Sequence, residues 1–198
     1  MIIKVCGITN AEQAATISTF VDYIGFIFHP QSKRYTANAF ATVAAKKTGV
    51  FVNASIKQVI RVSILEKLEA VQLHGDESPE FCSALQHQIP VIKSFGIYGD
   101  FDFEQLKAYE STVDYFLFDT KTSAYGGSGI TFNWDLLDRY QGSVPFLLSG
   151  GIRPELLKKI KRISHPQLAG IDLNSGFEIE AGIKNIELLK QFIDEFKS

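Results

Sequence analysis

The feature that most constrains this chain is a regular alternation between short apolar segments and helix-like segments. Eight segments are rich in β-branched and aromatic residues, which is typical of buried strands: residues 2–6, 22–28, 49–53, 70–74, 90–95, 113–119, 144–149 and 168–173. Segments of helical composition follow them: residues 10–20, about 38–46, 56–66, one from Pro79, 104–109, one from Trp134, about 154–163 and one at the C-terminus. Strands that alternate with helices predict right-handed crossovers and a parallel sheet.

These eight strand–helix units fill the 198 residues without a linker or a low-complexity segment. Eight such units close naturally into a TIM, or (β/α)8, barrel. We therefore predict an α/β fold with a single barrel domain over residues 1–198, which is a minimal length for that fold. The alternative is an open, doubly wound sheet, but a closed barrel leaves no edge strand to protect.

Local signals place several helix ends. Thr9 and Glu12 have the spacing of a capping box, which predicts a helix start after the first strand. Ser78 followed by Pro79 predicts another start, with the serine as N-cap and the proline at the first helical position. The last helix is predicted to have one apolar face, made of Ile186, Leu189, Ile193 and Phe196.

The composition excludes several classes of protein. Apolar residues make up 45% of the chain, enough for a sizeable core. Charged residues make up 21% and the formal net charge is −2, so no basic nucleic-acid footprint is present. The 16 phenylalanines are scattered, which favours core packing over a base-stacking platform. No apolar run reaches membrane-spanning length, and the N-terminus reads as a strand instead of a signal peptide.

The cysteines and histidines argue against a disulfide framework and a metal site. The two cysteines, Cys6 and Cys82, together with the lack of an export signal, indicate a reducing cytoplasm. Cys82 lies beside apolar helix positions and is predicted to be core. The histidines are dispersed, and neither cysteine has a partner at metal-ligand spacing. The dispersed histidines are His29, His74, His87 and His165.

Polar residues and glycines gather where the predicted strands end, and that end of a barrel carries the active site. The set comprises Cys6, the Arg34 loop, Asn53, His74, Phe95, Asp119, Ser149 to Gly151, and Asp172 to Gly176. Gly150 and Gly151 follow strand seven, and Ser175 and Gly176 follow strand eight. Barrels frequently bind phosphate after these two strands, through backbone N–H groups. We therefore predict a phosphate site there; the alternative for Gly150-Gly151 is a simple turn.

Asp119 and Cys6 are candidates for acid–base chemistry. Asp119 ends a strongly apolar strand, so desolvation should raise the pKa of its carboxyl and suit it as a general acid. The alternatives are an ion pair with Lys121 or a helix cap. Cys6 is then a base or nucleophile, if positive charge from Arg34 or Lys4 promotes the thiolate. Its alternative is a small apolar core residue, which is common for an unpaired cysteine.

Two further residues have functional and structural interpretations. His74 is an alternative base, or a hydrogen-bonded structural histidine. Arg34 suits a carboxylate or an aromatic face on a ligand, or it is a solvated surface residue.

Taken together, these residues resemble the phosphoribosylanthranilate isomerase family of tryptophan biosynthesis over nearly the whole chain. The resemblance rests on 4–9 (Lys-Val-Cys-Gly-Ile-Thr), 25–28 with Ser32 and Arg34, 49–52, 72–76, 118–121, 126–129, 148–152 and 172–176 (Asp-Leu-Asn-Ser-Gly). The Cys-Gly-Ile-Thr opening combined with the late Asn-Ser-Gly is quite specific to this family among phosphate-binding barrels.

The resemblance implies an Amadori rearrangement of an aminoaldose phosphate, phosphoribosylanthranilate, to an aminoketose phosphate, with no cofactor and no metal. It implies that Cys6 is the general base at sugar C2 and that Asp119 is the general acid at the ring oxygen. It also implies contact of Arg34 with the anthranilate part, and places His74 and Asp172 in the site. It further implies that the backbone of Gly150, Gly151, Ser175 and Gly176 binds the phosphate. Both a monomer and a homodimer remain open.

The chain departs from the family pattern at Ser128, Asn133, Phe177, Ala181 and Asn185, of which Phe177 is expected to narrow the phosphate region. Two other functions remain as alternatives. One is a related phosphosugar isomerase of the histidine pathway, although that enzyme generally has an aspartate where this chain has Cys6. The other is a phosphosugar-binding barrel that has lost its chemistry, although Cys6 and Asp119 are both present.

Overall fold

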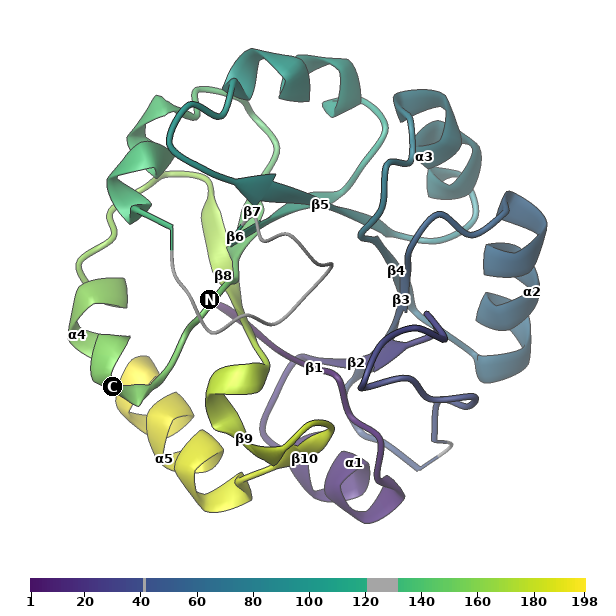
Figure 1. The fold of residues 1–198 in the computed structure, drawn as a ribbon, viewed down its shortest axis with the longest axis vertical. Helices are drawn as coiled ribbons and strands as arrows, with labels where there is room; N and C mark the ends of the chain where they lie inside the picture. The colour runs from purple at the N-terminus through teal and green to yellow at the C-terminus, as the bar shows by residue number, and fades with distance from the viewer. Residues whose placement is uncertain (41, 121–131) are drawn as a thin grey trace.

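Eight parallel strands form a closed barrel in which each strand pairs with its neighbours in the sequence (Figure 1). The computed structural model describes residues 1–40, 42–120 and 132–198. The strands are β1 (Ile2–Cys6), β2 (Tyr23–Ile27), β3 (Lys46–Phe51), β4 (Ala70–Leu73), β5 (Val91–Ile97), β6 (Tyr115–Thr120), β7 (Phe146–Leu148) and β8 (Leu168–Leu173). Pairing of Lys4 with Asp172 joins β1 to β8 and closes the ring. The predicted barrel is therefore confirmed, and the open sheet is excluded.

Helices surround the strands as an outer ring (Figure 1). The α-helices are α1 (Ala11–Ile17), α2 (Ile56–Glu66), α3 (Pro79–Gln86), α4 (Leu157–Ile160) and α5 (Ile186–Lys197). The 3₁₀ helices are η1 (Phe103–Tyr109), η2 (Trp134–Arg139), η3 (Pro154–Leu156) and η4 (Ser175–Phe177). A two-stranded hairpin, β9 (Glu178–Glu180) with β10 (Ile183–Lys184), lies between η4 and α5. On α5, Leu189 and Ile193 are buried, as the predicted apolar face requires.

The helix expected over residues 38–46 is wrong for the described part of that segment, which runs without helix into β3 at Lys46. Hydrogen bonds to neighbouring elements hold the segment instead. The Ala39 N–H donates to the Glu66 carboxylate at the end of α2, and the Ala44 N–H donates to the Ser18 hydroxyl at the end of α1. These long-range contacts override the high helix propensity of alanine.

The capping box predicted at Thr9 is also wrong, because Asn10 caps α1 by accepting a hydrogen bond from the Gln13 N–H at 2.9 Å. The Thr9 hydroxyl instead donates to the Gly182 carbonyl in the β9–β10 turn, 173 residues further on. The predicted start of α3 is confirmed, with Ser78 as N-cap and Pro79 in the first turn.

The apolar core has two parts. The larger part lies between the barrel and its helices and includes Phe116, Phe118 and Phe146, with the last two rings 4.7 Å apart. The smaller part is a layer in the barrel lumen made of Ile92, Leu117 and Leu147. Other lumen positions are polar although they are buried, namely Lys4, Thr48, Gln72, Ser94 and Asp172. Buried polar groups need hydrogen-bond partners, and Lys4 with Asp172 and Gln72 with Ser94 pair with each other in the lumen.

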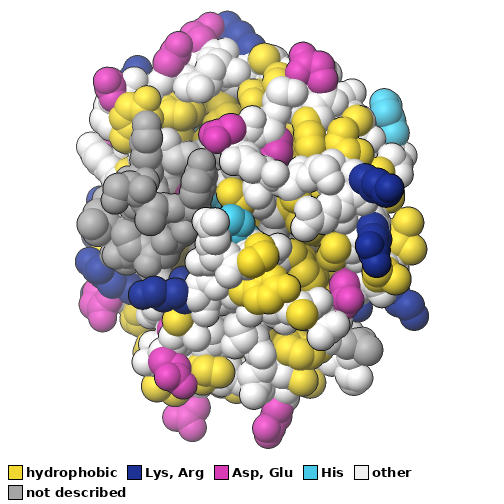
Figure 2. All heavy atoms as spheres, turned by 45° about the vertical axis from the view of Figure 1, so that its right-hand side comes forward, with side chains coloured by type: hydrophobic (Ala, Val, Ile, Leu, Met, Phe, Trp, Pro, Cys, Tyr) yellow, Lys and Arg dark blue, Asp and Glu magenta, His cyan; other side chains and the backbone are white. Residues whose placement is uncertain are grey.

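The described residues form no extended patch of one charge on the face drawn in Figure 2, as the small net charge predicts. On the face in Figure 2, basic and acidic side chains are interspersed, and neither sign covers the face. Within residues 1–40, 42–120 and 132–198, none of the helices combines the length and the apolar character needed to cross a membrane.

Candidate active site

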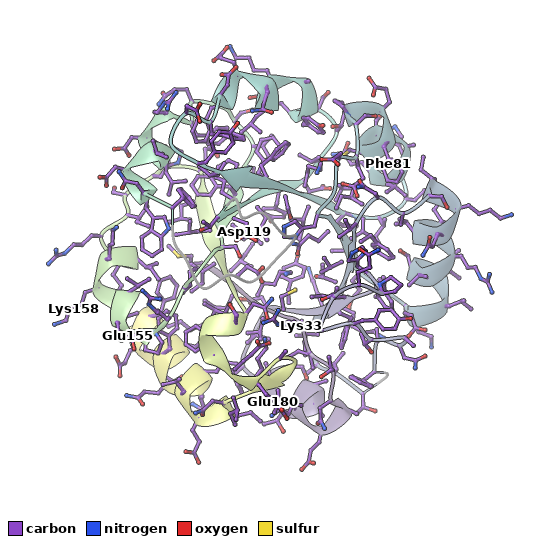
Figure 3. All side chains as sticks on the ribbon, viewed as in Figure 1. Lys33, Phe81, Asp119, Glu155, Lys158 and Glu180 are labelled. Carbon is purple, nitrogen blue, oxygen red and sulfur yellow. The ribbon has the colours of Figure 1, made fainter. Side chains whose placement is uncertain are left out.

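A pocket opens at the carboxyl ends of the strands, and all the residues predicted to be catalytic, substrate-binding or phosphate-binding line it. Its lining includes Cys6, Arg34, His74, Asp119, Gly150, Gly151, Asp172, Ser175 and Gly176. Asp119 lies close to the barrel axis (Figure 3). Two other residues of the predicted rim lie elsewhere. Asn53 pairs with Glu77 and Asp76, and Phe95 packs edge-on against Phe116.

Cys6 ends β1 with its thiol buried in the barrel. Gly25 on β2 makes room for the sulfur, since a Cβ at Gly25 would lie only 2.7 Å from it. Burial raises the pKa of the Cys6 thiol above its ordinary value; the Lys4 and Lys184 ammonium groups oppose this shift and Asp172 reinforces it. Because burial dominates, the thiol holds its proton at neutral pH when no ligand is bound. The Lys4 charge therefore lowers the pKa of Cys6, as the sequence predicts, but it does not offset burial, and no thiolate forms.

Asp119 lies near the end of β6, which β7 and β8 separate from β1 and Cys6 in the ring. Burial raises the pKa of its carboxyl to about 6, as the apolar strand predicts, and the charge of Asp172 adds to the shift. A hydrogen bond of 2.8 Å from the Thr120 N–H to Oδ1 and the charge of Lys4 act in the opposite direction. The carboxyl thus titrates close to neutral pH, as a general acid needs. Its suggested partner Lys121 lies outside the described residues.

His74 follows β4 and lies beside Asp119. Burial lowers the pKa of His74 to about 4, with the nearby Lys93 charge as a further cause, so the ring is neutral at pH 7. Its Nε2 is 3.6 Å from Asp119 Oδ2. Because the ring is neutral, this contact is not an ion pair. A pKa this low also makes His74 a poor general base.

Arg34 is held by a carboxylate that the sequence did not point to. Its Nε lies 2.8 Å from Oε1 of Glu178, and its Nη2 lies 2.6 Å from Oε2. Glu178 also pairs with Lys184 Nζ at 2.7 Å, and that ammonium donates to Asn174 Oδ1. Burial raises the pKa of Glu178, but Arg34 and Lys184 together hold it below its ordinary value. The guanidinium is therefore fixed and largely buried, which excludes a solvated surface arginine.

A second buried ion pair joins the two ends of the chain in the lumen. Lys4 Nζ lies 2.9 Å from Asp172 Oδ1, and the Ser149 hydroxyl is 3.5 Å from Oδ2 of the same carboxylate. Two features of the sequence indicate these buried charges. One is a lysine inside the β-branched segment 2–6, and the other is the group of charged residues that follows Gly176.

The two glycine-containing loops meet at one side of the pocket. Gly150 and Gly151 have positive φ values of 83° and 66°, which L side chains rarely adopt. At Gly176 a Cβ would collide with the Ile152 carbonyl, so the two loops are in close contact. The two loops therefore contribute backbone without side chains to the pocket lining, at the place where the sequence predicts the phosphate site.

The expected narrowing by Phe177 is wrong. Its ring is buried and packs against Phe192 with centroids 4.9 Å apart, away from the pocket lining. Among the other departures, Asn133 and Asn185 cap η2 and α5. Ala181 is exposed, and Ser128 lies outside the described residues. In the part of the chain that the structure describes, no three His, Cys, Asp or Glu side chains are grouped as metal ligands.

The fold and the pocket define a class: a (β/α)8 barrel of the enzyme type, with a buried thiol, a buried carboxyl and two glycine-containing loops at its mouth. The family model described as N-(5'-phosphoribosyl)anthranilate (PRA) isomerase matches residues 3–195, and the chain belongs to this family.

Comparisons with single proteins agree with this family. The chain is 48% identical to the N-(5'-phosphoribosyl)anthranilate isomerase of Parabacteroides distasonis, over 98% of this chain and 93% of that protein. It is 44% identical to that of Phocaeicola vulgatus, over 100% and 98%. The crystal structure from Thermus thermophilus superposes with a TM-score of 0.85 at 28% identity, over 100% of this chain and 98% of that one. Because the chain belongs to this family, the alternative of a phosphosugar isomerase of the histidine pathway is excluded.

A solved phosphoribosyl anthranilate isomerase is in complex with reduced 1-(o-carboxyphenylamino)-1-deoxyribulose 5-phosphate. It superposes with a TM-score of 0.82 at 32% identity, over 100% of this chain and 99% of that one.

Proposed function

We propose that this member of the family uses general acid–base catalysis, with Asp119 as the acid and Cys6 as the base. The family's reaction in tryptophan biosynthesis isomerises N-(5'-phosphoribosyl)anthranilate, an aminoaldose phosphate, to 1-(2-carboxyphenylamino)-1-deoxyribulose 5-phosphate. The observation that carries the proposal is that a buried carboxyl on β6 and a buried thiol on β1, two strands separated by β7 and β8 in the ring, line the same pocket. A sugar held between them presents its ring oxygen to one group and its C2–H to the other.

The two groups complete the reaction without an oxidant or a reductant. Asp119 protonates the ring oxygen as the C1–O bond breaks, which gives an open-chain iminium. Cys6 removes the proton from C2, and the electron pair of that bond forms a C1–C2 double bond while the iminium nitrogen regains its lone pair. The resulting enol tautomerises: a proton adds to C1, the C2 hydroxyl becomes a ketone, and Cys6 and Asp119 return to their starting states.

Arg34 is proposed to bind the anthranilate part. Glu178 occupies the Nε and Nη2 edge of the guanidinium, which leaves the planar faces for an aromatic ring and Nη1 for a carboxylate. His74 and Asp172 are proposed to line the sugar, where His74 is a neutral hydrogen-bonding group. The backbone of Gly150, Gly151, Ser175 and Gly176 is proposed to bind the phosphate.

Residues 1–198 are proposed to act as one catalytic domain in the cytoplasm on this small-molecule substrate, without a cofactor, a metal, nucleic acid or a membrane. A dimeric relative is known from Thermotoga maritima, and both a monomer and a homodimer remain possible here. The surviving alternative is a barrel that binds the phosphosugar without turning it over.

The test is the Cys6→Ser variant in a fluorescence assay of phosphoribosylanthranilate consumption. We expect kcat to fall on the order of a hundredfold or more, because a hydroxyl is a far weaker base than a thiolate at neutral pH. Titration with the reduced ketose phosphate should show that the variant still binds. A near-normal kcat in Cys6→Ser would show that Cys6 is not the base. Binding by the wild-type chain without turnover would favour the non-catalytic barrel.

A further inference from the structure

Gln72 on β4 carries a buried polar atom that the described residues leave unpaired. Its side chain is only 2% exposed. The amide nitrogen donates to the Ser94 hydroxyl at 3.0 Å and lies 3.4 Å from Nδ1 of His74. The amide oxygen has no hydrogen-bond partner within the described parts of the chain. A buried acceptor without a donor costs about 1–3 kcal/mol, so a protein does not keep one without a reason.

The position of Gln72 suggests that reason. Two other residues have an unpaired buried polar atom among those described, Thr48 and Trp134, and neither lines the active-site pocket. Gln72 does line it, two residues before His74. His74 in turn lies 3.6 Å from Asp119. Gln72 therefore belongs to the same pocket wall as His74 and the proposed acid Asp119, and its amide oxygen lies at the site where the substrate is proposed to bind.

The chemistry of the substrate selects the partner. Its phosphate and carboxylate only accept hydrogen bonds near neutral pH, whereas a carbonyl oxygen needs a donor. The sugar must lie between Cys6 and Asp119, because its C2 and its ring oxygen react there. The donors of the substrate are its sugar hydroxyl groups and the amine N–H beside C1. The ortho carboxylate of the anthranilate can accept that N–H within the same molecule, so the hydroxyl groups remain for Gln72.

We propose that Gln72 is a further substrate-binding residue, whose side-chain oxygen accepts a hydrogen bond from a sugar hydroxyl. This inference rests on the proposed function, since it requires a phosphorylated sugar derivative in the pocket. The side chain is already held for this role, because Ser94 fixes its nitrogen. The same nitrogen donates to Nδ1 of the neutral His74, which leaves the ring proton on Nε2, facing Asp119.

The test is calorimetric titration with reduced 1-(o-carboxyphenylamino)-1-deoxyribulose 5-phosphate and with analogues that lack each sugar hydroxyl in turn. For the wild-type chain, removal of one particular hydroxyl should weaken binding on the order of tenfold to a hundredfold. Gln72→Met has a similar length and no amide, so it should bind the parent compound that much more weakly. It should also no longer distinguish the parent from that one analogue. Gln72→Leu is the second variant if the methionine variant folds poorly.

Ser94→Ala is the matched control. It removes the anchor of the Gln72 nitrogen from outside the pocket lining, so it should affect all analogues alike and keep the discrimination. If Gln72→Met discriminates against every deoxy analogue as the wild-type chain does, the proposal is wrong. If the wild-type chain does not bind the parent compound at all, the proposed function fails as well. Binding of the parent without any hydroxyl dependence overturns only the role of Gln72.

Discussion

Replacement of Asp119 by asparagine should make the protein more stable and inactive at the same time. Burial raises the pKa of this carboxyl from 3.8 to about 6. The difference of about 2 pKa units corresponds to a penalty of about 3 kcal/mol for the ionised carboxyl in the folded state. Asparagine has nearly the same shape and can still accept the hydrogen bond from the Thr120 N–H, but it cannot ionise. The free energy of unfolding of the variant should therefore be higher than that of the wild-type chain at a pH where Asp119 is ionised.

The sign of the pH dependence follows from proton binding. Between pH 4 and 6 the folded state holds the proton of Asp119 more tightly than the unfolded state does. The wild-type chain therefore loses this stability as the pH rises through that range. The gain in Asp119→Asn should be about 3 kcal/mol at pH 8 and should shrink to about 1 kcal/mol at pH 4.5. Urea unfolding at the two pH values measures both numbers.

Turnover should change in the opposite direction, because asparagine cannot deliver a proton. We expect kcat to fall on the order of a hundredfold or more, with a much smaller rise in KM. Asp114→Asn is the matched control, just before the start of β6, where the carboxylate accepts a hydrogen bond of 2.8 Å from the Val91 N–H. That variant should lose about 1 kcal/mol of stability and keep its kcat. A variant of Asp119 that is no more stable at pH 8, or that keeps its kcat, would refute the reasoning.

The remaining predictions concern the arginine and the pH profile. Glu178→Gln leaves Arg34 and the buried Lys184 facing a neutral partner, so the free energy of unfolding in urea should drop by about 3 kcal/mol. KM should also rise up to about tenfold as Arg34 loses its fixed position; an unchanged KM would show that Glu178 does not position Arg34. For the wild-type chain, kcat/KM should fall below about pH 6, where Asp119 titrates, and again above the raised pKa of Cys6. A profile that stays flat down to pH 5 would contradict the assigned pKa of Asp119.

The fold and the central part of the site were predictable because they depend on local patterns. Apolar segments such as 113–119 are too short and too rich in aromatic residues for helices, and their order specifies parallel pairing. Since parallel strands end at one edge, the residues after them share one pocket, and Cys6 and Asp119 follow directly. The elevated pKa of Asp119 could be predicted for the same reason, because its strand is apolar on both sides.

The rest depends on contacts between distant parts of the chain. Arg34 and Glu178 are 144 residues apart and meet because the β9–β10 hairpin lies next to the loop after β2. Thr9 has a plausible capping partner nearby, but its hydroxyl is used by Gly182 across the fold. Residues 38–46 have good helix composition, yet hydrogen bonds to α1 and α2 hold the described part without a helix. Local propensity is a weak prior in such places.

The electrostatics of the pocket have a consequence for how the acid and the base work together. At neutral pH the stable arrangement has Cys6 protonated and Asp119 largely ionised, because the thiol has the higher pKa. The reactive arrangement has the proton on Asp119 and a thiolate at Cys6. Both arrangements contain the same number of protons, so their ratio does not change with pH between the two pKa values. The reactive form is therefore a constant minor fraction across that range, and the rate forms a plateau bounded by the two titrations.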